Sequence, residues 1–332
     1  AYFRGRLFRD DPDEPLALDG YEPVGQTDLA LDFIARNDGR PWCLFLSWGP
    51  PHAPYDQVPD RFKTLYDEKA LTQRPNVRAE PPEPFHPLGR GLNARALADY
   101  YAHITALDGQ LGRLLDALDA SGQAEDTLVV FTSDHGDMLW SHGLQKKEQP
   151  FEEAIRIPLL LRWPGRIPAG HRPEALGSIV DLAPTLLSLM GLEAPETVEG
   201  ADLSAIVLGG EAAGPESVFL CEPIILDQGF HQGIGEWRGV RTARYTYARW
   251  IDGSPWVLYD NQADPYQMTN LADLPDHAAV RQDLDAELSR WLARTGDRCE
   301  GWQDTVRTLG LVETWNERER FMHPQAPRLV EE

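Results

Sequence analysis

An acidic and an imidazole side chain follow a short apolar run in the middle of the chain. The run at residues 128–131 is rich in β-branched residues and predicts a buried strand, and Asp134, His135 and Gly136 come just after it. In open α/β sheets, ligands bind at the carboxyl ends of the strands. Carboxylate oxygens and imidazole nitrogens are common metal ligands, and glycine lets the backbone pass close to a ligand. The pattern therefore favours a metal site, although a turn with a helix cap would also account for it.

A histidine stands after a second apolar run. Residues 42–48 (WCLFLSW) predict another buried strand, and the loop that follows, GPPHAPY at residues 49–55, carries His52. An imidazole at a strand exit can bind a substrate or transfer a proton near neutral pH. The alternative is a histidine held by backbone hydrogen bonds in a tight proline turn. Residues 56–92 are irregular and rich in proline, which is typical of a binding loop or a mobile cover.

Strands and helices alternate in the part of the chain that would position these residues. Apolar residues recur every three to four positions over residues 94–120, which predicts a helix with Asn93 as its N-cap. Another helix is predicted to begin at Thr27, as its cap, and to run to about residue 37. A third short strand is predicted at residues 157–163. The strand–helix–strand order indicates an α/β fold with a parallel sheet.

The character of the sequence changes after about residue 215. Short apolar segments separated by turns predict an antiparallel sheet, and a helix is predicted over residues 278–295. The predicted strands lie at residues 217–221, 238–242, 245–250 and 256–259. We therefore expect a catalytic domain over residues 1–215 and a small C-terminal subdomain of sheet, helix and tail over residues 216–332.

The bulk composition argues against several classes of function. The chain has 332 residues, a net charge of −22 and a pI near 4.7, which argues against binding to nucleic acid or to acidic membranes. An anionic substrate would need a local group of basic residues, because the overall field repels it. The three cysteines do not make a disulfide framework. No apolar run reaches the length of about 20 residues that a membrane span requires.

Three segments in order along the chain resemble a known family. They are GPPHAPY at 49–55, SDHGDML at 133–139 and HGLQKKEQPFEE at 142–153. Further shared motifs lie at residues 100–102, 112–114, 181–185, 238–242, 258–260, 264–266 and 270–271. The set resembles the type I sulfatases of the alkaline-phosphatase-like superfamily over most of residues 25–295. The resemblance implies an α/β/α sandwich, here N-terminally incomplete, with a smaller antiparallel-sheet-plus-helix subdomain.

The resemblance also implies a chemistry and a metal. Family members hydrolyse sulfate esters with a formylglycine nucleophile and a divalent metal, usually Ca²⁺, with Mg²⁺ or Mn²⁺ as alternatives. It makes Asp134 and His135 metal-site residues. His135 could instead bond the nucleophile or a sulfate oxygen, and the sequence does not choose between these roles.

Other residues acquire roles from the same resemblance. His52 matches the histidine that contacts the sulfate or protonates the leaving oxygen, and Lys147 matches the lysine that reaches the sulfate, with Lys146 as its solvated neighbour. His142 would line the substrate pocket. Arg238 and Arg241 would project toward the mouth of the active site, although a solvated strand face is an equally good interpretation of their pattern.

The nucleophile motif of the family, Cys/Ser-x-Pro-x-Arg, does not occur in this sequence. Cys221-Glu222-Pro223 begins like it, but Ile225 stands where the arginine is required. The early Asp-Asp pair of the family metal site is also absent. We expect both, including the formylglycine, to lie upstream of residue 1, and we expect this chain alone to be inactive.

Several alternatives remain open at the level of the sequence. A phosphonate monoester or phosphodiester hydrolase of the same superfamily would share the tetrahedral, anionic substrate geometry. A non-catalytic relative, or one half of a two-chain enzyme, would also explain the missing nucleophile. The expected partner is a small-molecule or carbohydrate sulfate ester. The particular ester, the oligomeric state and the compartment, whether periplasmic, secreted or cytoplasmic, are not indicated.

Overall fold

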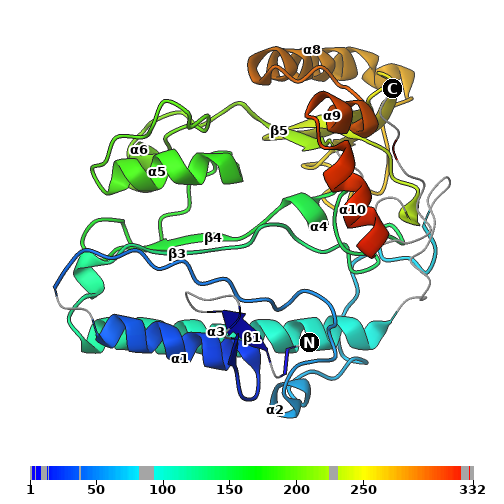
Figure 1. Ribbon diagram of the computed structural model, residues 1–332. Helices are drawn as coiled ribbons and strands as arrows, with labels where there is room; N and C mark the ends of the chain where they lie inside the picture. Colours follow the sequence, from blue (N-terminus) through cyan, green and yellow to red (C-terminus); the bar gives the residue numbers. More distant parts are fainter. Residues whose placement is uncertain are drawn as a thin grey trace. The chain divides into compact units, whose positions relative to one another are not determined.

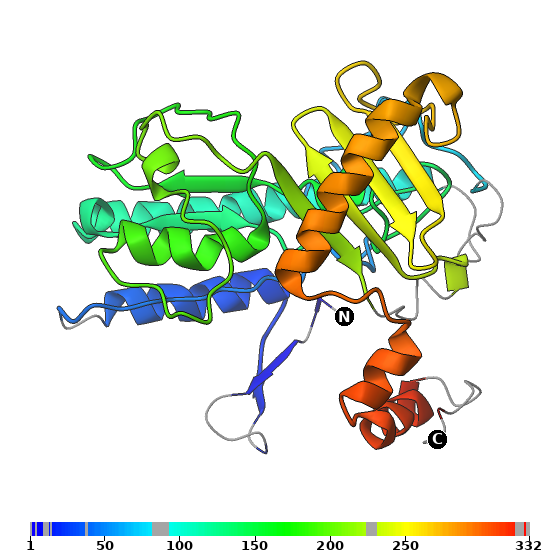
Figure 2. The same ribbon diagram turned by 90° about the horizontal axis from the view of Figure 1, so that it is seen from above.

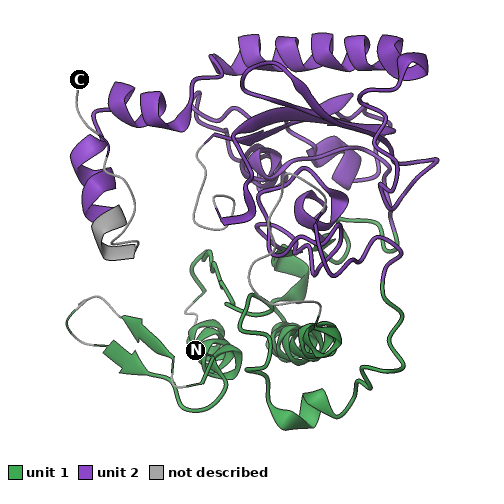
Figure 3. Cartoon of the chain, turned by 90° about the vertical axis from the view of Figure 1, so that its right-hand side faces the viewer, with its two compact units in different colours: residues 1–73, 92–132, 159–170 green, residues 74–91, 133–158, 171–332 purple. Residues whose placement is uncertain are grey.

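The computed structural model describes residues 2–3, 5–8, 13, 15–36, 39–81, 93–223, 231–322 and 329. The chain divides into two compact units, each assembled from segments that are distant in sequence (Figure 3). Unit 1 comprises residues 1–73, 92–132 and 159–170, and unit 2 comprises residues 74–91, 133–158 and 171–332. The predicted division at residue 215 stays a prediction.

Unit 1 is built around two long helices, α1 (Glu22–Ala35) and α3 (Ala94–Ala120), which lie side by side (Figure 2). The prediction of α3 and of its cap is confirmed, because the Asn93 side chain accepts a hydrogen bond from the Arg95 N–H at 3.1 Å. The rest of the unit comprises a hairpin of β1 (Arg6–Phe8) and β2 (Pro15–Ala17), the short helices α2 (Asp60–Lys63) and η1 (Ala124–Asp126), and a pair of strands.

The pair of strands corrects the predicted parallel sheet. β3 (Val129–Thr132) pairs antiparallel with β4 (Leu159–Arg162), and residues 42–48 form no ladder with any described strand. The side chains of residues 42–48 do alternate between half-buried and exposed, and Phe45 is 92% exposed. Local pattern specifies which side chains share a face, but a ladder also needs a partner that is distant in sequence.

Unit 2 contains the antiparallel sheet that the sequence predicts. The strand order is β5 (Ser217–Glu222), β6 (Trp237–Thr242), β7 (Tyr245–Trp250) and β8 (Pro255–Asp260). The helices of the unit include α4 (Glu152–Ile155), η2 (Ile179–Asp181), α5 (Leu182–Leu189), α6 (Ser204–Val207), η3 (Pro275–His277), α8 (Ala278–Thr295), α9 (Trp302–Thr308) and α10 (Val312–Met322) (Figure 1).

Both faces of this sheet are covered, and each face has its own apolar core. On one face, α8 packs Leu284 and Leu288 against Tyr247 and its neighbours on the sheet. On the other face, the loop after β3 and helix α4 pack side chains that include Met138 and Phe151 against the sheet. The alternation of strand side chains between two faces produces these two cores. The segment that contains the candidate site is therefore held on the C-terminal sheet.

Part of the predicted proline-rich excursion, residues 82–92, lies outside the described residues. Among the helices that are described, none combines the length and the apolar character needed to cross a membrane.

Candidate active site

Asp134 and His135 form a tight turn that is closed against α4. The Asp134 Oδ1 atom accepts the His135 backbone N–H at 3.0 Å, and the His135 Nδ1 atom lies 2.7 Å from the Gly136 carbonyl oxygen. The Gly136 N–H donates to the Ala154 carbonyl at 2.8 Å. A Cβ at Gly136 would lie 1.9 Å from the Glu153 carbonyl oxygen, so only glycine fits here.

The donor atoms of this turn are arranged as two ligands of one metal ion would be. The His135 Nε2 and Asp134 Oδ2 atoms lie 3.5 Å apart, and the Asp134 side chain is 80% exposed. Two ligands about 2.3 Å from a shared cation, at a right angle, are separated by about 3.3 Å, so the turn fits a divalent metal. In the part of the chain that the structure describes, no group of three or more His, Cys, Asp or Glu residues gathers around a point. Asp134 and His135 are thus a pair of candidate ligands, and their role at a metal stays a prediction.

His52 lies in unit 1 and has an exposed imidazole with a fixed orientation. Its Nδ1 atom is 2.7 Å from the Ala53 carbonyl oxygen, and its backbone carbonyl accepts the Tyr2 hydroxyl at 2.6 Å. Burial, with a further contribution from Glu22, raises the pKa of Tyr2 to about 12, so this phenol stays a donor. Because a carbonyl oxygen only accepts hydrogen bonds, the Nδ1 atom of His52 carries a proton in this contact.

The loop that carries Lys147 has an unusual backbone. Its non-glycine residues with positive φ are Leu139 (41°), Trp140 (66°), His142 (55°), Lys146 (66°) and Glu148 (84°). Side chains other than glycine rarely adopt this conformation, and strained backbone concentrates at functional sites. Lys147 is half-buried and stands between two of these residues. Trp237 on β6 donates its indole N–H to the Glu148 carbonyl at 2.9 Å, which ties the loop to the sheet.

His142 is buried in the same loop, with 5% of its surface exposed. Its ring stacks on Phe151 with centroids 4.3 Å apart, and its Nε2 atom lies 3.2 Å from the Asn76 amide nitrogen. Burial lowers the pKa of His142 to about 4, so the ring is neutral near pH 7 and its Nε2 accepts the amide N–H. These contacts support a packing role, and the predicted contact with substrate stays a prediction.

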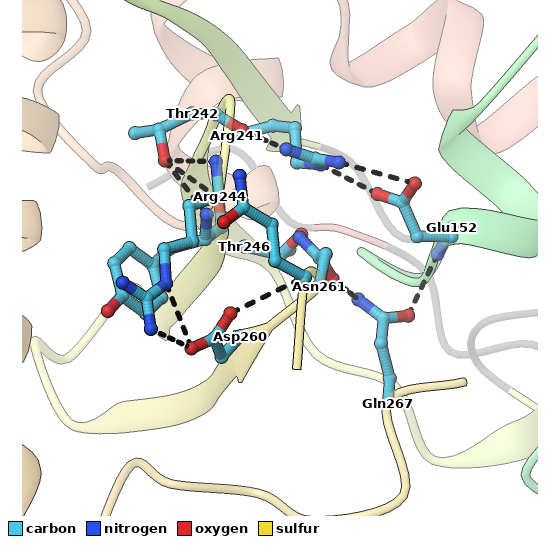
Figure 4. Close-up of polar contacts among 10 residues, drawn as sticks. Glu152, Arg241, Thr242, Arg244, Thr246, Asp260, Asn261 and Gln267 are labelled. Carbon is cyan, nitrogen blue, oxygen red and sulfur yellow. Dashed lines mark hydrogen bonds and ion pairs between the residues drawn. The ribbon is translucent and has the colours of Figure 1, made fainter. Parts of the chain in front are cut away.

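Arg238 and Arg241 on β6 are both engaged in ion pairs. Arg238 is 3% exposed, and its Nε lies 2.5 Å from Asp297 Oδ2. Although burial of Asp297 opposes it, hydrogen bonds from Arg238 and from the Cys299 N–H lower the pKa of the Asp297 carboxyl. Arg241 contacts Glu152 at the start of α4 (Figure 4). The predicted substrate contacts of these two arginines stay predictions, and the contacts present are structural.

The chain matches two family models, whose ranges overlap over residues 141–192. Residues 7–192 match the model described as Sulfatase, and residues 141–294 match the model described as N-sulphoglucosamine sulphohydrolase, C-terminal. The chain belongs to the sulfatase family. The predicted family and fold are therefore confirmed, and the structure is of the alkaline-phosphatase-like type with a C-terminal antiparallel sheet.

Among curated sulfatase relatives, the Ulvan-active sulfatase of Formosa agariphila is 32% identical over 282 residues, which cover 83% of this chain and 53% of that protein. The Choline-sulfatase of Rhizobium meliloti is 31% identical over 275 residues, covering 76% of this chain and 51% of that protein. The chain thus spans about half the length of the curated relatives it matches.

A solved structure from a study of glycosaminoglycan metabolism in Bacteroides thetaiotaomicron aligns with a TM-score of 0.74 at 27% identity, covering 86% of this chain and 61% of that chain. The Phosphonate Monoester Hydrolase of Agrobacterium radiobacter aligns with a TM-score of 0.70 at 26% identity, covering 82% of this chain and 60% of that chain.

Two residues that support the candidate site do not stand out in the sequence. Asn76 is fully buried, and its amide nitrogen lies 2.8 Å from Glu153 Oε1 as well as near His142. Gln267 accepts the Glu152 backbone N–H at 3.0 Å (Figure 4). Both side chains hold α4 by contacts between distant parts of the sequence. Asn76 and Glu153 are 77 residues apart, and Glu152 and Gln267 are 115 residues apart. No local pattern could have found them.

Proposed function

We propose that the protein is a metal-dependent sulfatase that hydrolyses the sulfate ester of a carbohydrate. The observation that carries the proposal is that Asp134 Oδ2 and His135 Nε2 lie 3.5 Å apart in a chain that belongs to the sulfatase family. We propose Ca²⁺ as the cation, because the resemblance to the family implies it and because the Asp134 carboxylate suits a hard cation, with His135 as the second proposed ligand. Membership of the family supports a formylglycine nucleophile, which no residue of this sequence provides.

The residues of this chain have distinct roles in the proposed reaction. A divalent metal held by Asp134 and His135 would neutralise the sulfate oxygens as charge develops on them. Lys147 adds a compact positive charge for the sulfate, in a protein whose net charge would otherwise repel it. His52 is the residue that we propose to contact the sulfate or to give a proton to the leaving alcohol oxygen.

The proposed substrate class comes from the relatives. Two relatives each match more than four-fifths of this chain. One is named Ulvan-active sulfatase, and the other, from Bacteroides thetaiotaomicron at 28% identity, is named Endo-4-O-sulfatase. We take a sulfated carbohydrate as the substrate of this protein as well. Phosphonate monoester hydrolysis is the second candidate, and the likeness to the Agrobacterium radiobacter enzyme favours it over other reactions.

The test is a comparison of ester classes on the enzyme expressed from its full coding sequence together with a formylglycine-generating enzyme. We expect calcium-dependent release of sulfate from sulfated oligosaccharides and from 4-nitrophenyl sulfate. We expect kcat/KM for a phenyl phosphonate monoester to be lower. A preference for the phosphonate would establish the second candidate, and the absence of turnover on every ester would establish a non-catalytic protein.

A further inference from the structure

The loop between the metal-binding turn and Lys147 is closed on itself by one carboxylate. Asp137 Oδ1 accepts the Leu139 backbone N–H at 3.0 Å and the Lys146 backbone N–H at 3.2 Å. The first bond is local, whereas the second joins residues nine positions apart. Asp137 therefore lies two residues after His135 and binds the residue directly before Lys147.

This contact differs from the role that a carboxylate commonly has after a strand. An aspartate there ordinarily caps a helix, but residues 138–150 contain no helix. The two accepted N–H groups instead belong to the two ends of an irregular loop. A carboxylate that accepts backbone N–H groups makes charge-assisted hydrogen bonds, which are stronger than neutral ones.

The loop needs such a bond because its backbone is held in an unfavourable conformation. Leu139 and Lys146, whose N–H groups Asp137 accepts, both have positive φ. Non-glycine residues keep a positive φ only where contacts with the surrounding structure hold them in it. The Met138 N–H adds one bond to the Lys146 carbonyl at 2.7 Å, and the fully buried side chains of Met138 and Leu144 anchor the middle of the loop.

We propose that Asp137 is a positioning residue that sets the distance and direction between the metal-binding turn and the Lys147 ammonium. The proposal rests on the proposed function, in which Lys147 contacts the sulfate. Asp137 acts through the backbone: it fixes Lys146 in its left-handed conformation, and Lys146 directs the next side chain. A misplacement of a charged group by about 1 Å can cost about 100-fold in rate, so a residue in this role matters to catalysis without touching substrate.

The test is a double-mutant cycle between Asp137 and Lys147 on the active enzyme with a sulfate ester. Asp137→Ala should lower kcat/KM by about 30-fold, and Asp137→Asn, which keeps an oxygen acceptor, by less than about threefold. In a Lys147→Ala background, Asp137→Ala should cost less than about threefold more, because its effect passes through the lysine. If the loss of kcat/KM in the double variant equals the product of the losses in the two single variants, Asp137 acts independently of Lys147, and the proposal is overturned.

Asp252 provides a matched control. Its Oδ1 accepts the Ser254 N–H at 2.8 Å in the turn between β7 and β8, which is the same kind of contact in a different place. Asp252→Ala should leave kcat/KM unchanged. If Asp137→Ala does not fold, Asp137→Ser takes its place in the cycle with the same expectations.

Hydrogen exchange separates failure of this proposal from failure of the proposed function. In Asp137→Ala, the Lys146 amide should exchange at least about tenfold faster than in the wild type, while amides of α8 keep their rates. If the wild type hydrolyses no sulfate ester, the proposed function fails, and this exchange measurement alone decides whether Asp137 holds the loop. An unchanged Lys146 rate would overturn the positioning role in either case.

Discussion

The Arg241 guanidinium on β6 and the Glu152 carboxylate at the start of α4 form an ion pair with an Nε–Oε1 distance of 2.7 Å (Figure 4). Both side chains are largely buried, with 17% and 12% of their surfaces exposed. Because the Gly136 N–H donates to the Ala154 carbonyl of α4, this pair connects the C-terminal sheet to the turn that presents Asp134 and His135. The small sheet is thus a support for the site.

Removal of either partner of this pair should destabilise the protein, since the other charge would be left buried. We expect Arg241→Met and Glu152→Gln each to lower the free energy of unfolding by about 2–3 kcal/mol. Urea unfolding measures the change. The exposed pair of Arg36 and Asp32 at the end of α1 is the control, and Arg36→Met should cost no more than about 0.5 kcal/mol. Equal losses for the two pairs would contradict the supporting role.

The buried His142 should make stability depend on pH. Burial lowers its pKa to about 4 in the folded state, whereas the unfolded chain has the ordinary value near 6.5. Above pH 6.5 both states are neutral, and as the pH falls from 6.5 to 4 only the unfolded state binds the proton. Stability should therefore decrease over this window, by at most about 3 kcal/mol from this residue.

Unfolding of the wild type and of His142→Gln at pH 7.5, 6.0 and 4.5 measures this dependence. The variant should lose less stability on acidification than the wild type. His103, which is fully buried and whose pKa burial also lowers to about 4, is left intact in both proteins and contributes equally. Parallel curves for the two proteins would show that His142 is not the group responsible.

The parts of the fold that depend on local pattern could be predicted from the sequence. Helix α8 and the four strands β5 to β8 agree with prediction because their periodicity and turns are local. The start of α1 could not be predicted from Thr27. The helix begins five residues earlier, with Pro23 in its first turn, and the Thr27 hydroxyl donates to the Pro23 carbonyl within it. A threonine whose hydroxyl donates to a carbonyl one turn earlier in a helix cannot be told from an N-cap threonine by sequence alone.

The site divides in the same way. The Asp134–His135 turn could be predicted because its motif is contiguous and follows a strand. Asn76 and Gln267 could not, since their role depends on contacts between distant segments. The pairing of β3 with β4 in place of the predicted parallel order has the same origin, because strand partners are chosen by tertiary structure.

Substitution of a proposed metal ligand should abolish activity without affecting the fold. Asp134 is exposed, so Asp134→Asn should leave the free energy of unfolding in the absence of metal unchanged within about 0.5 kcal/mol. The loss of a charged ligand should lower kcat at saturating Ca²⁺ by at least about 100-fold and raise the Ca²⁺ concentration for half-maximal activity. A chelator should inactivate the wild type, and added Ca²⁺ should restore it. Activity that resists chelation would contradict the metal proposal.

The adjacent lysines provide an internal comparison for the proposed sulfate contact. Lys147→Ala should lower kcat/KM by about 100-fold or more, because it removes a charge that faces the anion in the transition state. Lys146 has a φ of 66°, so the appropriate control is Lys146→Asn, since asparagine tolerates the left-handed region better than alanine does. This control should keep kcat/KM within about twofold of the wild type, because the Lys146 backbone N–H that Asp137 accepts is retained. Steady-state kinetics on one sulfate ester measures both variants. A larger loss at Lys146 than at Lys147 would exchange the proposed roles of the two residues.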